Sequence, residues 1–165
     1  MKLALGLLFA TTTIFCAQTP QNHRSLANGV YAVACETPTR ETPKRGDVSR
    51  ITLVYDQHYS EADRNDPPNY VTLDTSSFVP LRLAGPPTTA KADTGWTLLN
   101  LTLAPEHVKT LEDFTRTHLG GRVAIVIDRE IITMHKVRSV ITGGQVQITR
   151  CQDDACQVLR RKLTE

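Results

Sequence analysis

The sequence predicts an α+β fold, because strand-like and helical segments occupy separate stretches of one chain. Segments that alternate apolar and polar residues recur from residue 29 onward, and segments with a helical apolar period follow in the last third. Of the 165 residues, 40% are hydrophobic and 22% are charged, which is typical of soluble globular proteins. The length predicts one domain with a less regular N-terminal extension.

Strands dominate the chain before its first helix. β-branched and aromatic residues that alternate with polar ones predict them at Gly29–Cys35, Val48–Tyr55, Tyr70–Asp74, Phe78–Leu83 and Trp96–Leu103. Two segments between these strands, Asp56–Asn69 and Gly85–Asp93, are rich in Pro and Asp. They predict exposed loops, because they lack an apolar period.

The last third begins with a helix. Pro105 suits the first helical position, because an N–H at that position would have no partner within the helix. The negative charge of Glu106 is favourable beside the positive, N-terminal end of the helix dipole. Gly120 and Gly121 predict a left-handed stop. The apolar stripe of the helix consists of Val108, Leu111, Phe114 and Leu119.

A hairpin and a closing helix are predicted after Gly121. Arg122–Ile127 is an apolar strand, and Asp128–Glu130 is a tight turn. The return strand, a further strand and the final helix are predicted at Ile131–Met134, Gln145–Thr149 and Asp153–Leu163.

The N-terminus predicts a secretory signal peptide over residues 1–17. Lys2 gives a positive end, and the apolar run that follows is shorter than the roughly 20 residues that span a bilayer. An uncleaved anchor is the alternative. Lipidation of Cys16 is not favoured, because Phe15 precedes it where a small residue is expected. We therefore expect a periplasmic or secreted protein without a stable membrane span.

Several motifs together resemble the head subdomain of the first periplasmic domain of SecD, in the SecDF protein-export family. The motifs, in chain order, are Leu103–Lys109, Phe114–Thr117, Gly121–Asp128 and Val140–Thr149, followed by the closing helix. The resemblance extends over about Tyr70–Leu163 and implies a mostly antiparallel sheet with two main helices packed on one face. Domain divisions at residues 1–17, 18–69 and 70–165 follow from it.

The chain departs from that family at functionally important points. The glycine that the family has after the hairpin aspartate is Arg129 here, so the turn must either avoid positive φ or strain Arg129. SecD couples proton flow to head movement through several membrane helices, and this sequence predicts none. We therefore expect a head-like protein that lacks the motor.

The cysteines offer two disulfide pairings. If the helix cap is Gln152, Cys151 and Cys156 take the two positions that a hydrophobic staple brings together, and the family has an apolar residue at the Cys151 position. We therefore predict a Cys151–Cys156 disulfide in an oxidising compartment. The alternative joins Cys35 to one of these two cysteines.

The hairpin is the candidate binding surface. Its basic side chains, together with Met134 and His135, predict a contact site for a protein partner. The simpler alternative is that these are ordinary solvated charges around a turn. The candidate residues are Arg122, Asp128, Arg129, Met134, His135 and Arg138, and Lys136 lies among them.

Other kinds of site are not predicted. The histidines lack metal-ligand spacing, no nucleophile motif occurs, and no basic cluster of a nucleic-acid-binding type is present. We therefore expect no enzyme, cofactor or metal, and a protein or unfolded polypeptide as partner. Two alternative hypotheses are an inhibitor or immunity-type factor, with its specificity in the Asp56–Asn69 and Gly85–Asp93 loops, and an unrecognised hydrolase.

Overall fold

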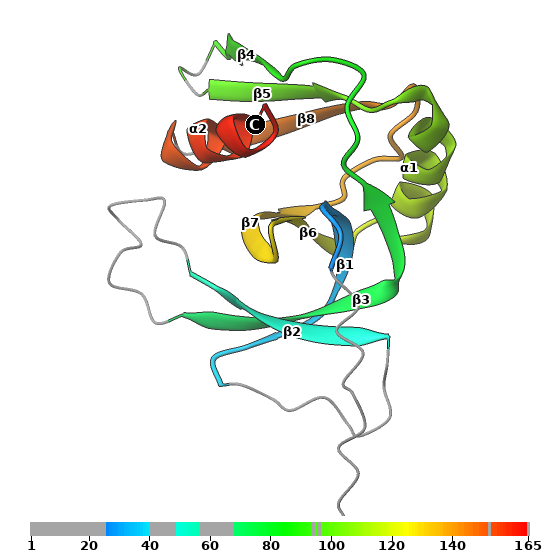
Figure 1. Ribbon diagram of the computed structural model, residues 1–165, viewed down its shortest axis with the longest axis vertical. Coiled ribbons are helices and arrows are strands. Elements are labelled where there is room, and N and C mark those ends of the chain that lie inside the picture. Colours follow the sequence, from blue (N-terminus) through cyan, green and yellow to red (C-terminus); the bar gives the residue numbers. More distant parts are fainter. Residues whose placement is uncertain are drawn as a thin grey trace, which may run out of the picture.

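The computed structural model describes residues 26–39, 49–56, 68–93, 95, 97–151 and 153–164, and its strands form two sheets (Figure 1). The predicted signal peptide, Cys16, Trp96 and most of the Asp56–Asn69 loop lie outside these residues. Every strand pair in the described part is antiparallel, which confirms the mostly antiparallel α+β prediction.

The larger sheet has five strands in the order β2-β3-β1-β6-β7. Its central strand, β1, comes from the N-terminal segment and pairs with both β3 and β6. The N-terminal and C-terminal parts of the described chain therefore share one sheet, whereas the proposed domain boundary at residue 70 stays a prediction. The bounds are β1 Gly29–Thr37, β2 Arg50–Tyr55, β3 Asn69–Pro80, β6 Arg122–Ile127 and β7 Glu130–Lys136.

The smaller sheet has three strands in the order β4-β5-β8. The strands are β4 (Thr88–Lys91), β5 (Thr97–Thr102) and β8 (Gln145–Cys151). The prediction of a loop over Gly85–Asp93 was wrong for β4. All four residues of β4 are exposed, so they show no alternation, and backbone pairing with β5 alone defines the strand.

Two helices complete the described fold. Helix α1 (Pro105–Thr117) has Pro at its start, and Gly120 follows its end with φ +81°, as the sequence predicts. Leu119 was wrongly assigned to the apolar stripe: it is 54% exposed, because the helix has already ended before it. Helix α2 (Asp153–Lys162) closes the chain.

The larger sheet carries apolar side chains on both faces. One core fills the space between the two sheets and the helices and includes Leu99, Ile132 and Leu159. The second core, with Leu73, Val126 and Ile131, lies on the other face, where the sheet curls into a half-barrel. The placement of both helices on one face of a single sheet is not confirmed, because the strands divide into two sheets and α2 lies between the smaller sheet and the β6–β7 hairpin (Figure 1).

Candidate functional site

The candidate site is the β6–β7 hairpin, whose turn consists of Asp128 and Arg129. Ile127 pairs with Glu130 across its base, so two residues make the connection. Both have positive φ, 52° at Asp128 and 67° at Arg129. This is the sign that tight hairpin turns require, and Gly or Asn meets it at least cost. Of the two outcomes expected from the missing glycine, the structure therefore has the strained one at Arg129.

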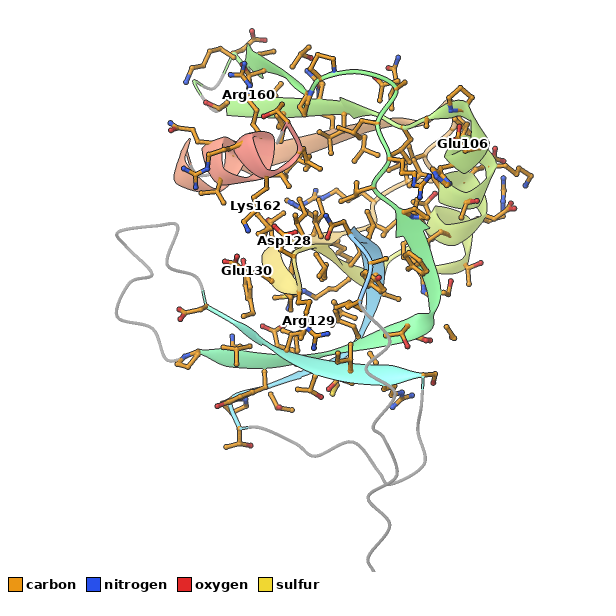
Figure 2. The ribbon with its side chains drawn as sticks, in the orientation of Figure 1. Glu106, Asp128, Arg129, Glu130, Arg160 and Lys162 are labelled. Carbon is orange, nitrogen blue, oxygen red and sulfur yellow. The ribbon has the colours of Figure 1, made fainter. Side chains whose placement is uncertain are left out.

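Side chains from distant parts of the chain hold this turn. The Asp128 backbone N–H donates to Asn28 Oδ1 at 2.8 Å, which ties the turn to the residue before β1. Lys162 Nζ lies 3.2 Å from Asp128 Oδ2 and 3.4 Å from Glu130 Oε2, so one ammonium bridges both carboxylates (Figure 2). The hairpin turn is thereby attached to the last residue of α2.

The ion pairs also change the basicity of Lys162. Its partial burial by itself would lower the pKa, but hydrogen bonds to Asp128 and Glu130 outweigh that effect and raise the pKa. Lys162 therefore stays charged, and its single positive charge is shared between the two carboxylates that flank Arg129.

Arg129 differs from its neighbours in the turn. It is exposed, and its guanidinium makes no hydrogen bond or ion pair with any residue that the structure describes. In Figure 2 its side chain lies on the side of the turn toward β2, whereas Asp128 and Glu130 lie toward Lys162. The Arg129 guanidinium is therefore exposed at the turn without an ion-pair partner among the described residues.

The other basic candidate residues lie at the far end of the hairpin. Arg122 pairs in register with Lys136, so the length of β6 separates it from the turn. Its guanidinium forms an ion pair with Glu36 of β1, and Glu36 also accepts a hydrogen bond from Asn69. Arg138 is exposed just beyond β7. The structure therefore does not bring Arg122 and Arg138 together with Arg129 in one cluster.

Met134 and His135 lie within β7. Met134 is partly buried and packs against the second core. His135 Nε2 lies 3.0 Å from Thr133 Oγ1, and burial lowers the pKa of the imidazole. Both side chains contribute to packing, so a contact made by β7 would use its free backbone edge together with these half-buried groups.

Sequence reasoning did not find Asn28 or Lys162. Neither residue belongs to a motif, and they lie 100 and 34 residues from Asp128. The one sequence signal at Lys162 is its place among the basic residues in the last turn of α2. Such residues are favourable beside the negative end of the helix dipole, and this does not indicate Asp128 as a partner.

No group of metal-ligating side chains is found in the described part of the chain. The Nε2 atoms of His107 on α1 and of His118, the residue that follows α1, are buried and have no hydrogen-bond partner among the described residues. The His118 ring packs against Phe114, with centroids 4.6 Å apart. None of the helices that the structure describes is long and apolar enough to cross a membrane.

Comparisons with known proteins find similarities in the second half of the chain. Residues 81–159 match the family described as SecDF, P1 head subdomain. The protein translocase subunit SecDF of Thermus thermophilus is 44% identical over 50 residues, which are 30% of this chain and 7% of that protein. The protein translocase subunit SecD of Thermobaculum terrenum is 38% identical over 56 residues, which are 34% of this chain and 11% of that protein.

Solved SecDF structures also align with this chain. The crystal structure of SecDF in its super-membrane-facing form covers 47% of this chain and 11% of its own length, with 29% identity and a TM-score of 0.39. A second structure is described as that of a membrane component, SecDF, that enhances protein export. Its alignment covers 82% of this chain and 63% of the SecDF chain, with 21% identity and a TM-score of 0.45. The resemblance to the SecD head is confirmed: residues 81–159 match the SecDF P1 head subdomain.

Proposed function

We propose that this chain is a non-catalytic, exported protein that binds another protein or an unfolded polypeptide in the periplasm. The curated relatives are named as protein translocase subunits, and the matched segments are 7% and 11% of their lengths. The chain would use a head-like fold for this binding. The signal peptide and the periplasmic location are parts of this proposal.

The free edge of β7 is the observation that carries the proposal. Among the described strands, β7 pairs with β6 alone. Because the sheet curls into a half-barrel, β2 lies near the other edge of β7 without pairing with it, and an added segment would lie between the two strands. The seven residues of β7 are enough for a segment to add as a further strand. By contrast, β4 has only four residues, all exposed, and ends in Lys91, features that protect an edge from pairing.

Strand addition also explains why the binding residues would lie around the hairpin. Backbone hydrogen bonds to β7 would supply affinity without sequence preference, and alternate side chains of the bound segment would meet the neighbouring surfaces. Met134, His135 and Arg138 lie on or just after β7, and Arg129 lies in its turn. We therefore keep these residues as the candidate contact set.

Hydrogen–deuterium exchange tests this proposal with reduced, carboxymethylated lactalbumin as a permanently unfolded probe. We expect the probe to slow exchange of amides in residues 130–136, because new backbone hydrogen bonds protect them. The edge strand over residues 88–91 is the internal control and should not change. Slower exchange at 88–91 without any at 130–136, or no change at either segment, would contradict strand addition at β7.

A pull-down from periplasmic extract separates this function from the inhibitor hypothesis. A spread of exported polypeptides agrees with binding of unfolded chains. A single stoichiometric partner would indicate an inhibitor or immunity-type factor instead.

We also propose the Cys151–Cys156 disulfide as a staple at the start of α2. Cys35 is a free thiol in β1, whereas Cys156 is 2% exposed at the start of α2. The side chain of Cys151 lies outside the described part of the chain, so the pairing itself is the proposal. Peptide mapping without reduction tests it, and a crosslinked peptide that contains Cys35 would overturn it.

A further inference from the structure

Asn28 is followed by Gly29, and this pair of residues is able to modify itself chemically. Of the five asparagines in the chain, Asn28 is the one that a glycine follows. The backbone nitrogen of the following residue can attack the side-chain amide carbon of asparagine, and glycine obstructs this attack least because it has no Cβ. Asn28 is also exposed, so water reaches its side chain. Sequence and exposure together indicate a site of deamidation.

The fold places this reactive pair where three elements meet. Asn28 lies directly before β1, and its Oδ1 atom accepts the hydrogen bond from the Asp128 backbone N–H at 2.8 Å. Its main-chain carbonyl accepts a second hydrogen bond, from the Leu81 N–H, at 3.1 Å. Gly29 pairs with both neighbouring strands, β3 and β6. A chemical change at Asn28 therefore acts on the end of β3 and on the β6–β7 turn.

The same contacts slow the reaction. The attacking nitrogen belongs to Gly29, which is buried and paired at the first position of β1. The Asn28 side chain must turn toward this nitrogen, so its hydrogen bond with Asp128 has to break first. The end of a strand opens more easily than its centre. Breaking one or two hydrogen bonds should make the folded chain react about 5 to 30 times more slowly than an unstructured peptide.

We propose that Asn28 is a deamidation site whose rate the fold controls and whose isoaspartate product loosens the β6–β7 turn. The Gly29 nitrogen gives up its proton and forms a bond to Asn28 Cγ, while the side-chain nitrogen takes up a proton and leaves as ammonia. Water then opens the five-membered imide at one of its two carbonyl groups, which gives aspartate or isoaspartate. One water is consumed and one ammonia is released, with no oxidant or reductant.

Isoaspartate is the product that disturbs the turn. It adds one carbon to the main chain before Gly29, so the hydrogen bonds to Leu81 and Asp128 cannot both keep their geometry. It also adds a carboxylate near Asp128, whose own carboxylate already shares the single charge of Lys162 with Glu130. Like charges at short range repel each other. Aspartate keeps an acceptor for the Asp128 N–H, so we expect a smaller effect from it.

Incubation of the folded full chain in water enriched in heavy oxygen tests the site. At mildly alkaline pH, opening of the imide places one heavy oxygen atom in the product, and digestion in acid followed by mass spectrometry locates it. We expect the label at residue 28 and none at Asn69 or Asn100, which precede Tyr and Leu. Asn28→Gln is the matched control, because its longer side chain would have to form a six-membered ring and should stay unlabelled.

A synthetic peptide of residues 26–31 gives the rate without the fold. Absence of label at residue 28 of the folded chain, after a time sufficient for a reaction about 30 times slower than that of the peptide, would overturn the site. Label at Asn28→Gln, or equal label at Asn100, would overturn it too, since attack by Gly29 would not be the cause.

Hydrogen–deuterium exchange tests the effect on the turn. Ion exchange separates the isoaspartate form, which carries one more negative charge, from the unreacted chain. We expect the Asp128 amide to exchange faster in the isoaspartate form, because its acceptor on residue 28 is displaced. Equal exchange in the two forms would overturn the role in the turn. Neither result depends on whether a segment adds to β7.

Discussion

The two turns that flank β6 use the same region of backbone space with different residues. Before β6, Gly120 has φ +81°, and after it Asp128 and Arg129 have φ 52° and 67°. Glycine reaches this region without steric cost, whereas arginine does not. The first turn is therefore unstrained at Gly120, whereas the second turn has a strained backbone at Arg129.

The two turns also differ in the groups that hold them, which are backbone atoms at the first turn and side chains at the second. The Gly120 N–H donates to the Val137 carbonyl at 2.9 Å, so backbone groups fix the first turn. The second turn depends on the side chains of Asn28 and Lys162. Backbone hydrogen bonds therefore fix the α1–β6 turn, whereas side chains from distant parts of the chain hold the β6–β7 turn in place.

The largest expected effect comes from Gly144, another position with positive φ, at +73°. A Cβ there would lie 2.6 Å from Val108 Cγ2, so Gly144→Ala adds a clash to the conformational cost. We expect the free energy of unfolding to fall by about 2–4 kcal/mol, measured by urea denaturation.

Val108→Ala in the same chain separates these two costs. It removes the clashing methyl group, so the Gly144→Ala penalty measured in that background should fall to about 1 kcal/mol. An unchanged penalty would mean that the close contact with Val108 does not determine the cost.

Gly120→Ala isolates the conformational cost, because a Cβ at this position meets open space. We expect the free energy of unfolding to fall by about 1 kcal/mol through the positive φ alone. Gly85→Ala is a matched control, since Gly85 also has open space around it and has no positive φ. Equal effects of the two substitutions would contradict the argument from φ.

Arg129→Gly should have the opposite sign. Removing the strain should raise the free energy of unfolding by about 0.5–1 kcal/mol, after the larger chain entropy of glycine is subtracted. Arg129→Ala keeps the strain and should leave the stability nearly unchanged. If Arg129→Gly destabilises the chain, the turn is not strained and the contrast with Gly120 disappears.

Lys162→Gln tests the side chains that hold the turn. Because these ion pairs are partly exposed, we expect a loss of only about 0.5 kcal/mol. The loss should be smaller in an Arg129→Gly background, where the turn no longer needs support. Denaturation of both single variants and the double variant measures this coupling, and strict additivity would show that Lys162 does not support the strained turn.

Replacing His135 should have the smallest effect on the free energy of unfolding at neutral pH and a measurable effect at acidic pH. Burial lowers its pKa below 6.5, so the unfolded chain binds a proton that the folded chain does not. This contribution is complete above the unfolded pKa and is lost as the pH falls toward the folded pKa, at no more than about 1.4 kcal/mol per pH unit.

His135→Gln should therefore make the acid-side slope of stability less steep, as measured by denaturation across a pH series. His135 pairs with Val123, so it lies nearer to the Gly120 end of β6 than to the β6–β7 turn, and the effect reports on that end of the hairpin. An unchanged slope would contradict the argument from burial.

Local patterns predicted most elements but not how they are grouped. Pro105 and Gly120 correctly marked the limits of α1, and the alternation in Gly29–Cys35 correctly indicated β1. The predicted strands at Tyr70–Asp74 and Phe78–Leu83 form most of one long strand, β3, that ends at Pro80. Sequence periodicity did not show this, because register shifts in β3's partner β1 accommodate the irregular stretch between them.

The candidate site was predicted only in part. The missing glycine at Arg129 identified the strained turn, since the required φ is a local property of a short hairpin. The supporting residues Asn28 and Lys162 could not be found in this way, because their proximity to Asp128 depends on how β1 and α2 pack around the hairpin. Arg122 was grouped with Arg129 by sequence proximity, yet an extended strand carries the two apart.

The sequence by itself determined the α+β class, the head-like order of the last third and the unusual arginine at the hairpin turn. These features depend on period, turn chemistry and motif order, which are local properties of the chain. Tertiary packing was needed to place the strands in two sheets, to make β1 central in the larger one and to bring Lys162 into ion pairs with Asp128 and Glu130. These outcomes depend on long-range pairing and packing, which bring together residues whose separation along the chain carries no signal.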